Sequence, residues 1–127
     1  MAGSGAKCAK LIMFRAHEGK IAEYDAYLHA AVEPIDREAV KQGALLDMLT
    51  LVNDAGGESG SEADAALPWT HLRIFLFENE AQRAAVKDAF TRIAPKLQPD
   101  EAARKARKAY GESLRTLLAE RDVGVLG

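Results

Sequence analysis

The sequence predicts an α+β fold in which four antiparallel strands form one sheet and the helices pack on one of its faces. Two observations support this prediction. Four short apolar runs have the length and composition of β-strands: residues 8–16, 45–52, 69–77 and 123–126. Two longer stretches, 21–43 and 79–117, repeat apolar residues every three or four positions, which is the spacing of one helix face. The expected order is therefore strand, helix, strand, strand, helices, strand.

Composition places this chain among ordinary globular proteins. With 127 residues, 48% hydrophobic and 28% charged, we expect a single domain over 8–127 after a flexible leader at 1–7. A net charge of −2 argues against a nucleic-acid partner, and no apolar run approaches the ~20 residues of a membrane span. The lone Cys8 fits a reducing compartment, so we expect a cytoplasmic protein with no membrane partner.

The first helical stretch contains two backbone signals. Pro34 lacks an amide hydrogen, so it is expected to kink this helix or to restart it at a first-turn position. Gly43 is well placed to end the helix in a left-handed conformation. Residues 53–68 follow the second strand; they are rich in glycine and acidic residues, and we expect a mobile loop that is either disordered or a lid.

The second helical stretch has its own start and break signals. Asn79 is an expected N-cap, and Gln82 three residues later completes a capping-box pattern. Pro99 and Asp100 break and restart the chain, and a further amphipathic segment continues through Leu117. The tail at 123–126 is expected to form a short final strand.

This element order suits a ferredoxin-like sheet with its helices on one face. The opposite face of such a sheet needs a cover, because a solvated apolar sheet face is unfavourable. A second copy of the chain is the economical cover, so we expect a homodimer.

The third predicted strand opens with Trp69-Thr70-His71 and closes with Phe77, before the acid-polar pair Glu78-Asn79. This segment resembles the third strand of the dimeric α/β-barrel superfamily, in its stress-responsive and olivetolic acid cyclase-like branch. The element order is similar over nearly the whole chain. The His-Pro-x-x-His motif of many members is absent, and the loop between the second and third strands is longer here.

The resemblance implies a dimeric α/β barrel with a small-molecule cavity between sheet and helices. Members include polyketide cyclases, cofactor-free monooxygenases, lyases and proteins without a known reaction. The fold does not choose among these chemistries.

Strand alternation divides the third strand into two faces. One face is uniformly aliphatic, as in a packed core: Leu72, Ile74 and Leu76. The other mixes polar groups with rings, which is typical of a ligand cavity: His71, Arg73, Phe75 and Phe77. We expect His71 to act as general acid or base and Arg73 to hold an anionic group. Alternatively, His71 is hydrogen-bonded structurally and Arg73 pairs with a neighbouring acid at the dimer edge.

Tyr24 and Tyr27 lie on the first helix, where a phenol could hydrogen-bond a developing oxyanion. In the resembling cyclases, an aromatic-rich first helix contributes to the cavity wall. The alternative is simple packing with the hydroxyl at water. Ile12, Phe14 and Phe75 are expected to supply the remaining cavity walls.

Other candidate chemistries are weaker. The three histidines lack the spacing of a helical metal site, and Cys8 is expected to pack as a small apolar residue, so we expect neither metal nor cofactor. The basic cluster at 104–108 alternates with alanines and is interpreted as a solvated helix face, with Glu101 paired to Lys105.

The leading hypothesis is a cofactor-independent enzyme that performs proton-transfer chemistry, such as cyclisation, isomerisation or lyase cleavage, on an aromatic or polyketide-like molecule. One alternative is a non-catalytic ligand-binding or stress-response dimer on the same fold. Another is a cofactor-free monooxygenase, which would consume oxygen with its substrate.

Overall fold

A computed structural model describes residues 5–53 and 67–126 of the chain. Most of the predicted loop at 53–68 and the first four residues of the predicted leader lie outside this range. The elements are β1 (Cys8–Ala16), α1 (Ile21–Tyr27), a π-helical segment η1 (Leu28–Val32), α2 (Glu33–Lys41), β2 (Asp47–Val52), β3 (His71–Phe77), α4 (Glu80–Leu97), α5 (Glu101–Ser113) and β4 (Arg115–Gly124). The predicted α+β class is confirmed.

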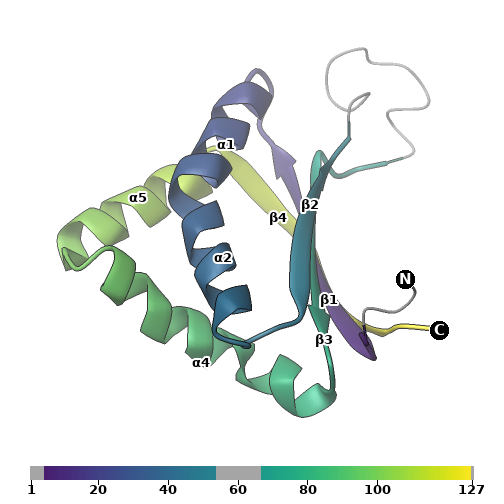
Figure 1. Cartoon of the computed structure of the whole chain (residues 1–127). Helices are drawn as coiled ribbons and strands as arrows, with labels where there is room; N and C mark the ends of the chain where they lie inside the picture. The colour runs from purple at the N-terminus through teal and green to yellow at the C-terminus, as the bar shows by residue number, and fades with distance from the viewer. Residues whose placement is uncertain (1–4, 54–66, 127) are drawn as a thin grey trace.

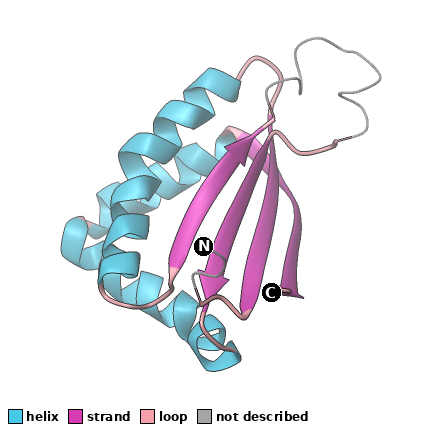
Figure 2. Ribbon diagram, turned by 45° about the vertical axis from the view of Figure 1, so that its right-hand side comes forward, coloured by secondary structure: helices cyan, strands magenta, loops and turns pink. Residues whose placement is uncertain are grey.

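The four strands form one antiparallel sheet in the order β2-β3-β1-β4, and the helices lie together on one side of it (Figures 1 and 2). This strand order and the helix placement are those of a ferredoxin-like fold. The sheet is open and does not close on itself, so the barrel in the expectation is not a property of the single chain. Strands β2 and β4 remain as edges because neither pairs with the other.

The backbone signals of the first helical stretch act as predicted. Pro34 lies in the first turn of α2, directly after η1, which is the predicted restart at a first-turn position. Gly43 ends the stretch with a φ of 80°, which glycine adopts without the strain that a side chain would add. The segment η1 joins α1 directly to α2, so the stretch is one continuous helical path with a widened turn in the middle.

Side-chain caps fix the starts of the two later helices. The Asn79 side chain accepts a hydrogen bond from the Gln82 amide at 2.8 Å, which confirms the predicted N-cap. The Gln82 side chain accepts from the amide of Glu78, at 2.7 Å, rather than from that of Asn79. Asp100 caps α5 by accepting from the Ala103 amide at 3.0 Å.

The C-terminal prediction was wrong in its boundaries. Helix α5 ends at Ser113, and β4 covers ten residues from Arg115 instead of a short strand at 123–126. Arginine, leucine, alanine and glutamate in this segment favour a helix locally. The strand forms because it pairs with β1 along its whole length, from Cys8–Gly124 to Ala16–Arg115, with an irregularity between Met13 and Phe14.

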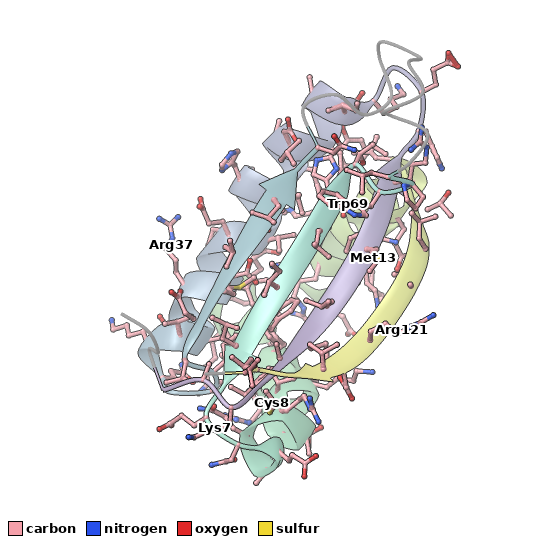
Figure 3. The ribbon with its side chains drawn as sticks, turned by 90° about the vertical axis from the view of Figure 1, so that its right-hand side faces the viewer. Lys7, Cys8, Met13, Arg37, Trp69 and Arg121 are labelled. Carbon is pink, nitrogen blue, oxygen red and sulfur yellow. The ribbon has the colours of Figure 1, made fainter. Side chains whose placement is uncertain are left out.

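The two faces of β3 separate as predicted, but the aliphatic face is the one that none of the described helices covers. The helices pack on the face of His71, Phe75 and Phe77, which are 0%, 5% and 0% exposed. Figure 3 looks onto the opposite face, with the helices behind the sheet. Its apolar residues include Leu11, Met13, Leu49, Leu51, Leu72, Ile74 and Leu76. Composition alone could not assign the helices, because both faces of this strand are largely apolar.

Two buried clusters hold the helices against the sheet. The first joins the start of β1 and the end of β3 to α2 and α4: Cys8, Ala39, Leu45, Phe75, Phe77, Val86 and Ile93. The second joins the Ala16 end of β1 to α1 and to the residue between α5 and β4: Phe14, Ala16, Tyr24 and Leu114. Within residues 5–53 and 67–126, none of the helices combines the length and apolar character needed to cross a lipid bilayer.

Candidate functional site

A buried ion pair lies between the middle of β3 and helix α2. Arg73 Nη2 donates to Asp36 Oδ2, and the two side chains are only 11% and 12% exposed. The Arg73 guanidinium also lies over the Phe75 ring, 4.9 Å from its centroid, and Nη2 is 3.7 Å from the Met48 sulfur. The pair is therefore held on several sides by β2 and β3.

Two cavities meet at this ion pair. The first, which we call the inner cavity, has a volume of about 490 Å³ and lies between the sheet and helices η1, α2, α4 and α5. Its walls are mainly apolar: Ile12, Tyr27, Ala31, Val32, Ile35, Phe75, Phe90 and Ala94. The second, the β2-side cavity, has about 610 Å³ and lies between η1, α2 and β2. Val32, Asp36 and Arg73 line both cavities, so the ion pair stands at their boundary.

The ion pair is incompletely satisfied. Burial raises the pKa of the Asp36 carboxyl, and the Arg73 guanidinium opposes that rise by favouring the charged form. Within the described chain, Asp36 Oδ1 and Arg73 Nε are buried without a hydrogen-bond partner. One free acceptor and one free donor thus remain at the junction of the two cavities, where buried polar atoms are costly.

Tyr27 lines the inner cavity and packs against α5. Burial raises the pKa of this phenol, which keeps it protonated and able to donate a hydrogen bond. Its ring stacks on Tyr24 with a centroid distance of 6.0 Å and meets Tyr110 edge-on at 5.9 Å. Gly111 of α5 permits the close approach, since a Cβ there would lie 2.2 Å from Tyr27 Cζ.

His71 lies outside both cavities. Its side chain is 0% exposed, with Nδ1 2.8 Å from the Thr70 hydroxyl and Nε2 2.6 Å from Asp25 Oδ1. A carboxylate only accepts, so Asp25 holds the hydrogen on Nε2. Asp25 itself is 39% exposed and lines the β2-side cavity. The imidazole therefore reaches a cavity only through the carboxylate.

Tyr24 belongs to the same buried layer as His71. It is 2% exposed, meets the His71 ring edge-on at 4.8 Å and packs against Phe14 at 6.2 Å. Burial raises the pKa of its phenol, and Arg115 partly opposes that rise. The Arg115 guanidinium in turn covers the Phe14 ring at 4.4 Å. This layer packs behind Tyr27 rather than around a cavity.

The structure divides the residues chosen from the sequence into two groups. Ile12, Tyr27, Arg73 and Phe75 all line the inner cavity. Phe14, Tyr24 and His71 form the buried layer beside it. In the part of the chain that the structure describes, no three His, Cys, Asp or Glu side chains are placed to share a metal ion.

Sequence reasoning missed Asp36, Asp25 and the lining role of the basic cluster on α5. A signal for Asp36 existed, because it lies four residues after Val32 and four before Val40, so the helical repeat carries a carboxylate in an apolar row. Asp25 gave no comparable signal. The basic cluster was visible, but its position at a cavity depends on how α5 packs.

The fold and site define an α+β protein of ferredoxin-like topology with a buried ion pair between two cavities. No protein-family model matches the chain, and no curated protein does. A structural match is the crystal structure of HapK from Hahella chejuensis, with a TM-score of 0.56 over 94% of this chain and 93% of that one. The identity of 10% makes this a likeness of fold alone.

Proposed function

We propose that this protein is a homodimeric, cofactor-independent enzyme that moves protons on a small, largely apolar molecule held in the inner cavity. The observation that carries the proposal is the buried Asp36–Arg73 pair at the boundary of two cavities, with the Tyr27 phenol in the same wall. Mostly apolar walls with a few convergent polar groups are typical of small-molecule sites.

The three polar groups suit enolisation chemistry. Asp36 is the proposed base, which takes a proton from a carbon beside a carbonyl, and its raised pKa brings it closer to neutral pH. Arg73 and Tyr27 are the proposed donors to the resulting enolate oxygen. Returning the proton to a different atom would complete an isomerisation. Attack of the enolate carbon on a second carbonyl, whose oxygen takes the proton back from Asp36, would complete a cyclisation.

The buried layer is proposed to position these groups. Tyr24 supports the Tyr27 ring by stacking, and the His71–Asp25 hydrogen bond fixes α1 to the start of β3. On this proposal His71 acts through its neighbours, since its ring has no direct contact with the inner cavity. Substituting His71 would then change substrate binding and turnover together rather than abolish proton transfer alone.

A second candidate is a non-catalytic ligand-binding dimer that uses the same cavity. The full burial of His71 and the pairing of both its ring nitrogens favour it, because a buried, satisfied imidazole is also a good structural element. The charge compensation of Arg73 by Asp36 fits this candidate as well.

The dimer is proposed from the open face of the sheet. Leu49 and Leu51 are 42% and 40% exposed there, next to half-buried apolar neighbours on β1 and β3. Apolar sheet surface of this kind is stabilised when a second copy covers it.

Hydrogen–deuterium exchange tests the proposed chemistry without knowledge of the natural substrate. Aryl ketones such as α-tetralone are incubated with the protein in D₂O, and deuterium at the carbon beside the carbonyl is followed by NMR. Native protein is expected to accelerate exchange, and Asp36→Asn to lose the acceleration by about 100-fold or more. Asp88→Asn, on the exposed side of α4, is the matched control.

The same samples separate the candidates. Ketone binding without accelerated exchange in the native protein would favour the non-catalytic candidate. Oxygen uptake that depends on the ketone would instead support the monooxygenase alternative. Absence of both binding and exchange across the aryl ketones would overturn the proposal of an enzyme for such molecules.

A further inference from the structure

Charge is distributed unevenly among the cavities of this molecule. The β2-side cavity is nearly balanced; its basic residues are Arg37, Lys41 and Arg73, with His29 beside them, and its acidic residues are Asp25, Glu33, Asp36 and Asp47. A third cavity of about 570 Å³ is balanced, with Lys10, Arg83 and Lys87 against Glu80, Glu120 and Asp122. Among the described residues, the inner cavity is lined by five basic residues, Arg73, Arg104, Lys105, Arg107 and Lys108, and by one acidic residue, Asp36.

This basic excess is local, because the whole chain has a net charge of −2. Four of the five cations come from one helix, α5, which Figure 1 shows in light green in the helix layer. The helix was expected from its sequence to turn these residues to solvent. It does expose Lys105, Arg107 and Lys108, while Arg104 is half-buried, and all four lie beside an apolar cavity.

Partners compensate some of these cations and leave others available. Asp36 pairs with Arg73, and Glu101 lies 3.5 Å from Lys105 Nζ. Arg104 donates to the backbone carbonyls of Gln98 and Pro99, just after the end of α4, at 2.8 and 3.1 Å. Across residues 5–53 and 67–126, no ion pair is formed by Arg107 or Lys108.

The position of these two cations relates them to the site. Both line the inner cavity and are exposed, and the charge of Arg107 acts on the Tyr27 phenol, whose pKa it lowers slightly against the effect of burial. Arg73, deeper in the cavity, already has a carboxylate partner. An anion on a ligand would therefore find uncompensated positive charge at α5 and not at the ion pair.

We infer that the ligand of the inner cavity is an amphipathic carboxylate, whose apolar body packs between Ile12, Phe75 and Phe90 and whose anionic group is held by Arg107 and Lys108. This inference rests on the proposed function for the cavity itself. It adds the charge of the ligand, its orientation and the two residues that select for it.

Three probes of nearly equal shape test the inference: 1-naphthoate, 1-naphthylmethanol and 1-naphthylmethylammonium. Their dissociation constants are measured on the full-length protein by NMR titration at low ionic strength. The anion is expected to bind at least tenfold more tightly than the cation, with the neutral probe between them. Added salt should reduce this preference, because exposed charges are screened.

A charge-matched pair of variants assigns the preference to residues. Arg107→Gln/Lys108→Gln is expected to weaken 1-naphthoate binding about tenfold and to leave 1-naphthylmethanol within about twofold. Arg92→Gln/Lys96→Gln removes the same charge from exposed positions on α4 that line none of the three cavities. This control should leave the affinity for all three probes nearly unchanged.

The outcomes separate the inference from the proposed function. Equal binding of the three probes, or equal effects of the two double variants, would overturn the carboxylate inference and leave the cavity as a ligand site. If the native protein bound none of the probes, the inner cavity would fail as a site for molecules of this size, and both proposals would fall.

Discussion

His71 and Asp25, 46 residues apart in the chain, are joined by a 2.6 Å hydrogen bond between Nε2 and Oδ1. The bond connects the first helix to the start of β3, and its imidazole end is fully buried. Asp25→Ala would leave Nε2 without a partner, so we expect a loss of about 1–3 kcal/mol in the free energy of unfolding. Chemical denaturation measures this loss.

The control for that measurement is Asp88→Ala, which removes an exposed carboxylate from α4 and is expected to change stability by less than about 0.5 kcal/mol. Equal effects of the two substitutions would show that the hydrogen bond to His71 contributes nothing to folding.

Gly111→Ala is expected to displace the Tyr27 ring. An added Cβ would lie 2.2 Å from Tyr27 Cζ, so α5 or the ring must move, at a cost of about 1–3 kcal/mol. Gly124→Ala meets no atom within 4 Å and is the control. In a Tyr27→Ala background the Gly111→Ala penalty should disappear, and a thermodynamic cycle of the four proteins checks this coupling.

Arg73→Met is expected to destabilise the protein in a pH-dependent way. Arg73 lowers the pKa of Asp36 against the effect of burial, so its removal raises that pKa further. Below pH 3.8, the ordinary pKa of this carboxyl, the group is protonated in both the folded and the unfolded protein, so a raised folded-state pKa costs no stability there. The loss of stability develops as the pH rises from that value through the folded-state pKa. Unfolding measured from acid to neutral pH should show the variant approaching native stability only at acid pH.

A destabilisation by Arg73→Met that becomes smaller as the pH rises would contradict this account of the ion pair. If the penalty of Arg73→Met were constant with pH, Asp36 would not be the group that senses the lost charge. Arg92→Met, at an exposed site on α4, provides the matched loss of one cation.

We expect the dimer to form through the open sheet face, and a charge introduced at the centre of that face should dissociate it. Ile74 lies at its centre, paired with Leu11 on one side and Leu49 on the other. Ile74→Lys is expected to raise the dimer dissociation constant by about 30-fold or more, as at an interface hot spot. Analytical ultracentrifugation measures it. Leu97→Lys, at a 43% exposed position on α4, should leave the dimer intact; a monomeric native protein would refute the interface.

The features that sequence predicted best depend on near neighbours. The first-turn Pro34, the left-handed Gly43 and the Asn79 cap each involve only a few adjacent residues. Strand β4 was mostly missed because its residues favour a helix locally, whereas its partner strand β1 lies about a hundred residues earlier in the chain.

The candidate site was predictable only in part for a related reason. Alternation on β3 correctly placed Arg73 and Phe75 on one face. The partner of Arg73 could not be named, because the Asp36 contact depends on how α2 packs against the sheet. The position of Arg107 and Lys108 at a cavity likewise requires the packing of α5.

The π-helical segment η1 has a consequence for changes in chain length. Each residue of an α-helix advances about 100° around the axis, so an insertion or deletion rotates every side chain beyond it. A π turn accommodates one additional residue without that rotation. Deleting one residue between Leu28 and Val32 should therefore restore a regular helix and keep Asp36 directed at Arg73. The same deletion between Glu33 and Ile35 should turn the carboxylate away from Arg73, so we expect this helical stretch to tolerate the loss of one residue in η1 and not in the first turn of α2.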